Sequence, residues 1–267
     1  ETVLILKMKF VQVDPKRTNN IAIILNCLKQ FSDTVTLRFS EDGIDVQGLD
    51  GSHVSLFEWK LTRDWFTEYI WTGDDDIQTA SLSTGIMHKV ISTFHEDQRM
   101  TMEIQATGDN VSLSFTSGKE TCDKHFELPL IDVDNDLLEI PEKDSDIDLI
   151  ISSKKFSELI GQFEIFDNTL SFKFSDEDIV MKATGVDGSM KASMSLDDVT
   201  EFALAEDKDE IKQSFALRYI KMMCSFSKIS SETCMEFTID SPMKLKYNMA
   251  DDSYIQFYLA TKSGEED

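Results

Sequence analysis

Histidines, cysteines and acidic runs are the residues of this chain whose chemistry could support a metal site or a catalytic centre. The four histidines are scattered, so they offer no set of zinc ligands at the usual spacing. The four cysteines show no paired spacing and stand singly inside apolar segments, which predicts reduced core thiols in a reducing compartment. These residues are His53, His88, His95, His125, Cys27, Cys122, Cys224 and Cys234.

Two of the acidic runs match the pattern of a calcium-binding loop only at its first positions. The run at 132–136 is followed by Leu137, where such a loop needs glycine, and by Lys143, where it needs glutamate. The run at 144–148 departs at the same two positions, and 74–76 is a row of adjacent aspartates. We expect solvated loops at all three runs and no metal. No phosphate loop, dinucleotide fingerprint or nucleophile elbow occurs, so we predict no catalytic residue, no cofactor and no enzyme.

The composition indicates a globular, strongly acidic protein. The chain has 267 residues, with 26 Lys and Arg against 50 Asp and Glu, giving a formal net charge of −24. Apolar residues make up 41%, which is enough to build a core, and the length allows one large domain or two ordinary ones. No apolar run reaches the roughly 18 residues of a membrane span, and no signal peptide is recognisable. The total charge opposes binding to nucleic acid, which is itself an anion.

An internal repeat organises the chain. A shift of 135 residues places 21–44 over 156–179, so that two amphipathic helices and two acidic-turn hairpins coincide. A second helix face and the strands after it repeat as well, with 100–105 matching 233–238 and 111–115 matching 243–247. Each half reads as helix, strands, helix, strands. We therefore predict an α+β fold made of a duplicated unit, with helices on one face of antiparallel sheets.

Four helices are predicted, each with a candidate cap at its start. Asp14 and Pro15 suit the N-cap and first position of the first helix, and Ser83, Ser153 and Ser214 suit the starts of the others. The predicted helices span 15–31, 82–94, 153–166 and 214–228.

The charge is distributed unevenly between these helices and the rest of the chain. The four helices together carry +7, which leaves −31 elsewhere. One interpretation is that helices tolerate lysine better than turns do. The other is a surface that attracts phosphates within a body that repels them, making contacts to the nucleic-acid backbone that are independent of sequence. The predicted DNA-binding residues are Lys16, Arg17, Lys29, Lys89, Lys154, Lys155, Arg218 and Lys221.

The segment that joins the halves, 128–148, is acidic and contains Pro129 and Pro141. A solvated linker is the default interpretation. The apolar residues Leu137, Leu138 and Ile140 are not needed in a linker, so we expect the segment to lie across a surface and help to form a groove.

Several motifs resemble one known family. The segment LDGSHVSL at 49–56 resembles the signature MDSSHVSL of proliferating cell nuclear antigen, the eukaryotic sliding clamp, and SFALRYI at 214–220 resembles its TFALRYL helix. Near the end, YNMAD at 247–251 and FYLATK at 257–262 resemble its YKIAD and YYLAPK segments. The similarity runs from about residue 8 to 262.

The resemblance implies a homotrimeric ring whose helices line a central hole for duplex DNA. Each subunit would have an N-terminal clamp domain at 1–131, a connecting linker at 132–148 and a C-terminal clamp domain at 149–267. In the family, strands at opposite ends of the subunit pair across the boundary, and 111–116 and 179–184 match them as strands left unpaired in a monomer. The implied interface residues are Val111, Leu113, Phe115, Ile179, Met181 and Ala183.

Client proteins of the family dock a short peptide, with two aromatics on a 3₁₀ turn, beneath the linker. Lys29 and Arg218 coincide with basic positions of the family. Other basic positions of the family are replaced here by Ala22, Ile23, Gly161 and Ser225, and its AP pair is Ala260-Thr261. The positions matching the client pocket are Leu49, His53, Val54, Leu56, Leu138, Ile140, Pro141, Pro242, Tyr258 and Ala260.

The function implied is a processivity factor that tethers DNA polymerase and other replication and repair proteins, placed on DNA by a clamp loader. The expected location is the nucleus, or the site of viral DNA replication if the source is a large DNA virus. Within the fold, a subunit of a heterotrimeric clamp and a monomeric processivity factor are alternatives. From other classes, an acidic scaffold not bound to DNA would lack a basic face, and a metal-dependent hydrolase would need clustered carboxylates. No membrane association is expected.

Overall fold

The computed structural model describes residues 6–72, 78–105, 109–118, 122–133, 138–141 and 143–262. It divides into two compact units that exchange short segments. Unit 1 comprises Glu1–Gly51, Glu58–Leu138 and Ala250–Tyr254. Unit 2 comprises Ser52–Phe57, Glu139–Met249 and Ile255–Asp267.

The described elements occur twice in the same order, which confirms the duplication. Repeat 1 consists of β1 (Leu6–Gln12), α1 (Pro15–Leu28), β2 (Thr34–Ser40), β3 (Gly43–Leu49), β4 (Ser55–Thr62), a 3₁₀ turn at Arg63–Trp65, β5 (Glu68–Trp71), β6 (Gln78–Ser83), α2 (Thr84–Ile91), β7 (Arg99–Gln105), β8 (Asn110–Thr116) and β9 (Lys124–Pro129). Repeat 2 consists of β10 (Ile147–Ser152), α3 (Ser153–Phe163), β11 (Thr169–Ser175), β12 (Asp178–Gly185), β13 (Gly188–Ser195), a 3₁₀ turn at Leu196–Asp198, β14 (Glu201–Leu204), β15 (Glu210–Ala216), α4 (Leu217–Cys224), β16 (Glu232–Phe237), β17 (Met243–Asn248) and β18 (Tyr254–Leu259).

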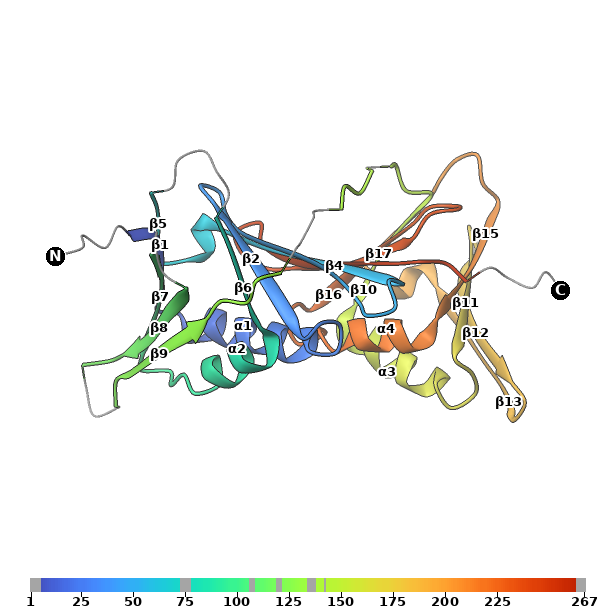
Figure 1. Ribbon diagram of the computed structural model, residues 1–267. Helices are drawn as coiled ribbons and strands as arrows, with labels where there is room; N and C mark the ends of the chain where they lie inside the picture. Colours follow the sequence, from blue (N-terminus) through green and yellow to red (C-terminus); the bar gives the residue numbers. More distant parts are fainter. Residues whose placement is uncertain are drawn as a thin grey trace. The chain divides into compact units, whose positions relative to one another are not determined.

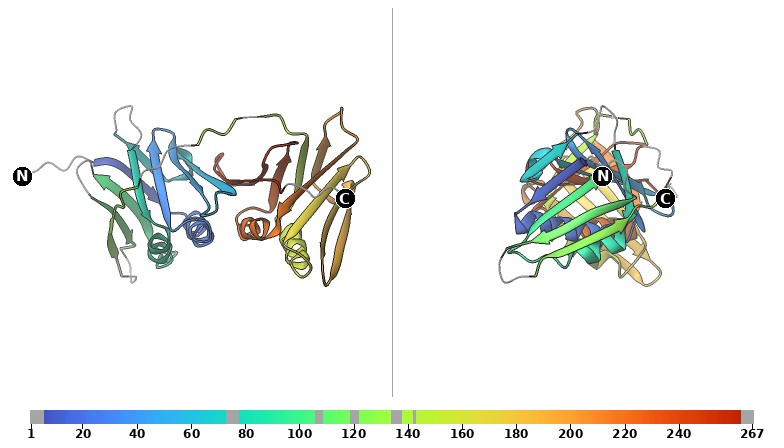
Figure 2. Two further views of the ribbon diagram at one scale, coloured as in Figure 1. Left: turned by 45° about the vertical axis from the view of Figure 1, so that its right-hand side comes forward. Right: turned by 60° about the vertical axis from the view of Figure 1, so that its left-hand side comes forward.

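The sheets of the two repeats have matching strand orders. Repeat 1 contains the sheet β5-β1-β7-β8-β9 and the run β4-β3-β2-β6, while repeat 2 contains β14-β10-β16-β17-β18 and β13-β12-β11-β15. The predicted hairpins are present, since Phe39 pairs with Ile44 and Phe174 with Ile179. In unit 1, α1 and α2 lie side by side against the sheets (Figure 1). In unit 2, α3 and α4 do the same, and Figure 2 shows each helix pair nearly end-on.

The hydrophobic core is formed by strands in which buried residues alternate with more exposed ones. In β7 and β8 every second residue is buried, because successive side chains of a strand point to opposite faces. In unit 2 an aromatic cluster fills the space between sheets, with the rings of Phe174 and Phe237 4.6 Å apart and those of Phe172 and Phe237 5.4 Å apart. The helices bury one face each, so their charged residues are left on the opposite, exposed face.

The helices are shorter than predicted. Helix α1 begins as expected, with the Asp14 carboxylate accepting from the Lys16 amide at 2.8 Å, but it ends at Leu28. The buried Phe31 extends the apolar period but lies in the turn that follows the helix, which explains the overprediction. Two caps were also misplaced. Ser152, not Ser153, caps α3, and Ser214 lies in β15, so α4 starts without a side-chain cap.

The prediction that 111–116 and 179–184 are unpaired strands is wrong. Strand β8 pairs with β7 on one side and β9 on the other, and β12 pairs with both β11 and β13. A strand with two neighbours has no backbone groups left for another chain, and its inward side chains belong to the core. The outer strands are β5 and β9 in the first sheet and β13 and β15 in the second, and of these β9 lies next to β8 and β13 next to β12. The predicted interface residues that are buried in their own sheets are Val111, Leu113, Phe115, Ile179, Met181 and Ala183.

The cysteines differ partly from the predicted core thiols. They form no disulfide with one another. Cys27 and Cys224 are buried, and burial raises the pKa of the Cys224 thiol to about 12, so it stays protonated. Cys234 is half-buried and Cys122 is exposed, because Cys122 precedes β9 at the outer strand of its sheet.

Candidate nucleic-acid and peptide interfaces

The paired helices of unit 1 present three exposed lysines. Lys16 lies in the first turn of α1, Lys29 is the C-cap of the same helix, and Lys89 lies in α2. The Lys29 ammonium lies 3.2 Å from Nδ1 of His88 on α2, so a positively charged lysine donates to a neutral imidazole. The sequence shows that His88 is adjacent to Lys89, but the hydrogen bond between Lys29 and His88 could not be predicted from it.

The environment of His88 keeps it neutral. Partial burial and the charges of Lys29 and Lys89 lower the pKa of His88 below its ordinary value of 6.5. A phosphate close to this trio would offset the repulsion between the cations, so the imidazole would take up a proton more easily in its presence.

We therefore expect DNA binding to raise the pKa of His88 and to strengthen as the pH falls from 7.5 to 6. The sign follows from linkage, because a ligand that raises a pKa binds more tightly when the proton is available. NMR titration of the His88 imidazole with and without a short duplex measures the shift, and His88→Gln identifies the signal. Identical titration curves in both samples would contradict a phosphate contact at this place.

The paired helices of unit 2 carry basic residues that are partly neutralised. Lys154 and Lys155 are exposed at the start of α3, and Lys154 lies 4.0 Å from Glu158. On α4, Lys221 is exposed and forms an ion pair with Glu164 at the end of α3. The Arg218 guanidinium lies over the Tyr219 ring, 4.6 Å from its centroid, and donates to its hydroxyl at 2.9 Å. These exposed ion pairs are weak, so the cations can exchange a carboxylate for a phosphate.

Arg17 stands apart from the other predicted DNA-binding residues. Its guanidinium forms an ion pair with Asp251 at 2.7 Å and donates to the Trp65 carbonyl at 2.6 Å and the Asp64 carbonyl at 3.2 Å. It also lies 5.0 Å from the centroid of the Trp65 ring. All of these groups belong to unit 1. Arg17 therefore connects the start of α1 to the 3₁₀ turn at Arg63–Trp65 and to Asp251.

Within unit 2 the structure brings two of the residues predicted to bind client peptides, Val54 and Ala260, into contact. The Ala260 amide donates to the Val54 carbonyl at 3.1 Å, so the start of β4 and the end of β18 lie together. His53 has a positive φ of 57°, which turns the chain just before this contact. Leu56 is buried, Val54, Ile140 and Tyr258 are half-buried, and His53, Pro141, Pro242 and Ala260 are exposed.

In unit 1 the two predicted client-binding residues are Leu49, half-buried at the end of β3, and Leu138, which is 45% exposed. The side chain of Gln47 binds the backbone of Leu138 twice, accepting from its amide at 2.8 Å and donating to its carbonyl at 2.9 Å. Leu137 lies outside the described residues. Gln47 was missed from the sequence, because an isolated glutamine in a strand gives no signal of a partner so far along the chain.

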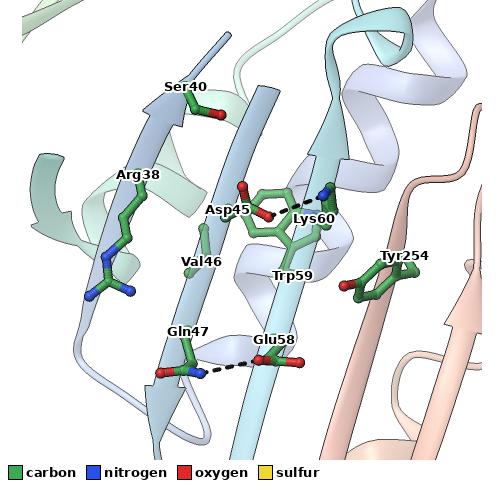
Figure 3. Close-up of a pocket in the computed structure, with 9 residues that line it drawn as sticks. All are labelled: Arg38, Ser40, Asp45, Val46, Gln47, Glu58, Trp59, Lys60 and Tyr254. Carbon is green, nitrogen blue, oxygen red and sulfur yellow. Dashed lines mark hydrogen bonds and ion pairs between the residues drawn. The ribbon is translucent and has the colours of Figure 1, made fainter. Parts of the chain in front are cut away.

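Gln47 also lines a cavity of about 250 Å³ in unit 1. Its amide donates to Glu58 at 3.1 Å, and Asp45 lies 3.9 Å from the Lys60 ammonium (Figure 3). Burial raises the pKa values of both Asp45 and Tyr254, as expected for a poorly hydrated space. The hydrogen bond to Glu58 orients the Gln47 side chain that also binds Leu138. Its lining residues are Arg38, Ser40, Asp45, Val46, Gln47, Glu58, Trp59, Lys60 and Tyr254.

The acidic runs contribute to loop structure where they are described. Asp146 accepts from the Ile239 amide at 2.7 Å, and Asp148 accepts from the Ser145 hydroxyl at 2.7 Å. The runs at 74–76 and 134–136 lie outside the described residues. No group of three metal-ligating side chains occurs in the part of the chain that the structure describes. Among the same residues, no helix has the length and apolarity needed to cross a membrane.

Comparison with known proteins gives consistent matches along the whole chain. Residues 16–138 match the family model for the proliferating cell nuclear antigen N-terminal domain, and 139–262 match the model for its C-terminal domain. The chain is 27% identical over 244 residues to proliferating cell nuclear antigen 2 of Drosophila melanogaster, covering 91% of this chain and 94% of that protein. It is 23% identical over 268 residues to proliferating cell nuclear antigen 1 of Plasmodium falciparum, covering 94% and 97%.

A solved structure agrees with the fold. The crystal structure of proliferating cellular nuclear antigen from Entamoeba histolytica superimposes with a TM-score of 0.85 at 20% sequence identity, covering 97% of this chain and 100% of that one. The duplicated repeat, the paired basic helices and both domain models lead to one conclusion. This chain belongs to the proliferating cell nuclear antigen family, whose members are non-enzymatic sliding clamps that bind DNA and partner proteins as multimers.

Proposed function

We propose that this protein is a homotrimeric sliding clamp that encircles duplex DNA and tethers DNA polymerase and other replication and repair proteins to it. The proposal rests on the two outer strands β9 and β13. Their equivalents in the other repeat are neighbours in a sheet, which suggests that β9 and β13 pair between copies. In the element order, β9 of repeat 1 corresponds to β18 of repeat 2, and β4 corresponds to β13.

The corresponding strands β18 and β4 are neighbours in the sheet order, and the Ala260–Val54 hydrogen bond joins their ends within unit 2. Strands β9 and β13 have no such neighbour among the residues described. Because β18 and β4 are neighbours and correspond to β9 and β13, we expect β9 of one copy to pair with β13 of the next copy. A heterologous contact of this kind closes into a ring when the rotation between copies is right.

The exposure of β13 supports this pairing. Every residue of β13 is exposed or only half-buried, although Met190, Ala192 and Met194 share the face that is buried in β12. An outer strand with apolar side chains left half covered is the usual starting point for pairing with another chain. We propose β9 and β13 in place of the strands first predicted from the resemblance.

A ring holds DNA by linkage, so its contacts with DNA can be weak. The exposed lysines of the helix pairs would centre the duplex through its phosphates, independently of sequence, while the net negative charge of the other elements limits binding outside the ring. A polymerase bound to the ring gains a high effective concentration at the template. We propose Lys16, Lys29, Lys89, Lys154, Lys155, Arg218 and Lys221 for the DNA contacts.

The proposal is tested by mass in solution together with retention on circular DNA. Light scattering should give three times the 30.4 kDa of one chain. Protein loaded by a clamp loader onto a closed circle should stay bound at high salt and be released when the circle is cut. A monomer that stimulates synthesis would indicate a processivity factor of another kind, and a chain that forms trimers only with other proteins would indicate a heterotrimeric clamp.

Neutralising Lys29, Arg218 and Lys221 together by glutamine should impair loading and processive synthesis while leaving the trimer intact. Each lost phosphate contact lowers the dependence of the logarithm of the binding constant on log salt by about one. A matched variant changes Lys9, Lys208 and Lys244, which pair with acids elsewhere, and should stimulate the polymerase normally. Equal stimulation by both variants at moderate salt would refute the basic lining.

For client peptides, Tyr258→Asp or Ile140→Asp should abolish binding of a synthetic peptide with two aromatics on a 3₁₀ turn, because a charge would replace apolar contact area. Calorimetry measures the affinity. Val186→Asp is a suitable control, since Val186 is fully exposed in a turn of the same unit. Unchanged affinity in the Tyr258 and Ile140 variants would contradict the proposed client pocket.

We further propose 132–148 as the connecting linker between clamp domains at 1–131 and 149–267. The proposed location is the nucleus, or a site of viral DNA replication.

A further inference from the structure

The exposed face of the sheet β13-β12-β11-β15 is basic, in contrast to the acidity of the chain as a whole. Residues paired across antiparallel strands share a face, so the register defines this surface. Its sixteen positions hold four lysines, eight serines or threonines and only two carboxylates, those of Asp178 and Glu210. The lysines, here named the lysine face, are Lys173, Lys182, Lys191 and Lys212.

The lysines of this face lie directly opposite one another. Lys182 is the register partner of Lys191, and Lys173 is the partner of Lys212. Like charges at directly opposed positions destabilise a sheet. In a chain with 50 acidic residues, two such pairs on one sheet are not explained by composition. An anionic ligand would remove the repulsion.

The two lysine pairs differ in how far they are neutralised. Glu210 binds both Lys173 and Lys212, at 2.6 Å each, so one carboxylate serves two ammonium groups. Within the residues that the structure describes, Lys182 and Lys191 form no ion pair, and both are exposed. At the end of the face where β11 begins, Lys262 donates to Thr169 at 2.7 Å and adds a further cation, while Asp167 and Asp187 lie in the turns at the same end. The positive charge therefore gathers around Lys182 and Lys191.

The chemistry of the lysine face distinguishes between classes of anionic ligand. Ammonium and hydroxyl groups, which make up most of this face, are common donors to phosphate oxygens. The apolar residues of the face are Val180 and Ala216, so it lacks the aromatic anchors on which protein partners depend and on which bases stack. Four strands about 4.8 Å apart spread the lysines over about 14 Å, a span of several phosphates along one strand.

We propose that the lysine face binds the phosphodiester backbone of duplex DNA, as a second surface independent of the helices and of ring closure. It contacts phosphates without reading sequence, and Lys182 and Lys191 contribute most because neither forms an ion pair with a carboxylate among the described residues. The surface would hold a segment of DNA that is not threaded through the ring.

The experiment measures binding of the full-length protein to a relaxed, covalently closed circular duplex without a clamp loader, so that a closed ring cannot be threaded. Lys182→Gln with Lys191→Gln should weaken binding about tenfold at 50 mM salt and lower the salt slope by about two. The matched control, Lys9→Gln with Lys244→Gln, removes the same charge from two strand lysines that already have acidic partners, and should bind like the unchanged protein.

Two results would overturn the proposal. One is equal affinity and equal salt slope for the Lys182/Lys191 variant and the control. The other is displacement of the DNA by oligoglutamate at the same charge concentration, which would assign the face to an acidic peptide instead. Loss of binding in the Lys182/Lys191 variant, with the trimer mass and polymerase stimulation retained, supports a DNA surface separate from the proposed clamp function.

Discussion

Ala192→Asp is expected to convert the proposed trimer into 30.4 kDa monomers. Ala192 is half-buried in β13, opposite Met181 of β12, on the face that would be covered when another copy extends the sheet. In the monomer the carboxylate can reach water past the open edge, but in the assembly it would be buried without a partner. An unpaired charge in an interface costs about 2–5 kcal/mol, which weakens association at least about thirtyfold.

Light scattering over a range of protein concentrations measures this effect, and thermal unfolding of the monomer shows whether the fold is kept. Thr184→Asp is the matched control. It adds the same charge to the neighbouring strand β12, on the exposed face and away from the outer strand. The proposed pairing of β9 with β13 is contradicted if Ala192→Asp assembles as well as Thr184→Asp does.

Gly43→Ala should lower the free energy of unfolding by about 3 kcal/mol or more. Gly43 begins β3 with φ of +140°, a conformation that other residues rarely adopt. A Cβ atom there would lie 2.2 Å from the Leu61 carbonyl oxygen and 2.9 Å from the Arg63 amide nitrogen. Both are backbone atoms, so the clash cannot be relieved by rotating a side chain. Tyr69, which donates to the Gly43 carbonyl at 2.7 Å, would be displaced as well.

Urea denaturation of the two proteins measures the difference. Gly161→Ala provides the opposite control, because Gly161 lies on the exposed face of α3 with open space around its Cα, and alanine there should raise stability by about 1 kcal/mol. If Gly43→Ala is as stable as the unchanged protein, the close approach of β3 to the end of β4 is incorrect.

Patterns local to one segment were predictable from the sequence. The hairpins at 34–44 and 169–179 were identified, because alternation shows which residues face the core and a short acidic turn separates the two strands. Helix ends were less predictable. Phe31 and Phe166 continue the apolar period beyond the last helical turn, so a buried turn residue cannot be told from a helical one.

The arrangement of strands could not be predicted, because it depends on pairings between distant segments. The outer strand β13 has the sequence GSMKASMS, which contains too few large apolar residues to be recognised as a strand. The sequence of β9, KHFELP, shows no clear alternation of apolar and polar residues either. The resemblance therefore led to β8 and β12, the neighbouring strands with strong apolar patterns. Arg17 was predicted to bind DNA, and its ion pair with Asp251 was missed because that residue is distant in sequence.

The exchange of segments between the two units has a consequence for the order of folding during synthesis. Unit 1 includes Ala250–Tyr254, and within it Thr62 donates to the Asp251 carbonyl and the Ser253 hydroxyl accepts from the Thr62 amide. These partners are synthesised after Glu139–Met249 of unit 2. An N-terminal domain usually folds while later residues are still being made, but here its contacts with residues 250–254 form only after most of unit 2 has been synthesised. A nascent chain stalled before residue 250 should therefore carry an N-terminal half whose α1 lacks its final anchor.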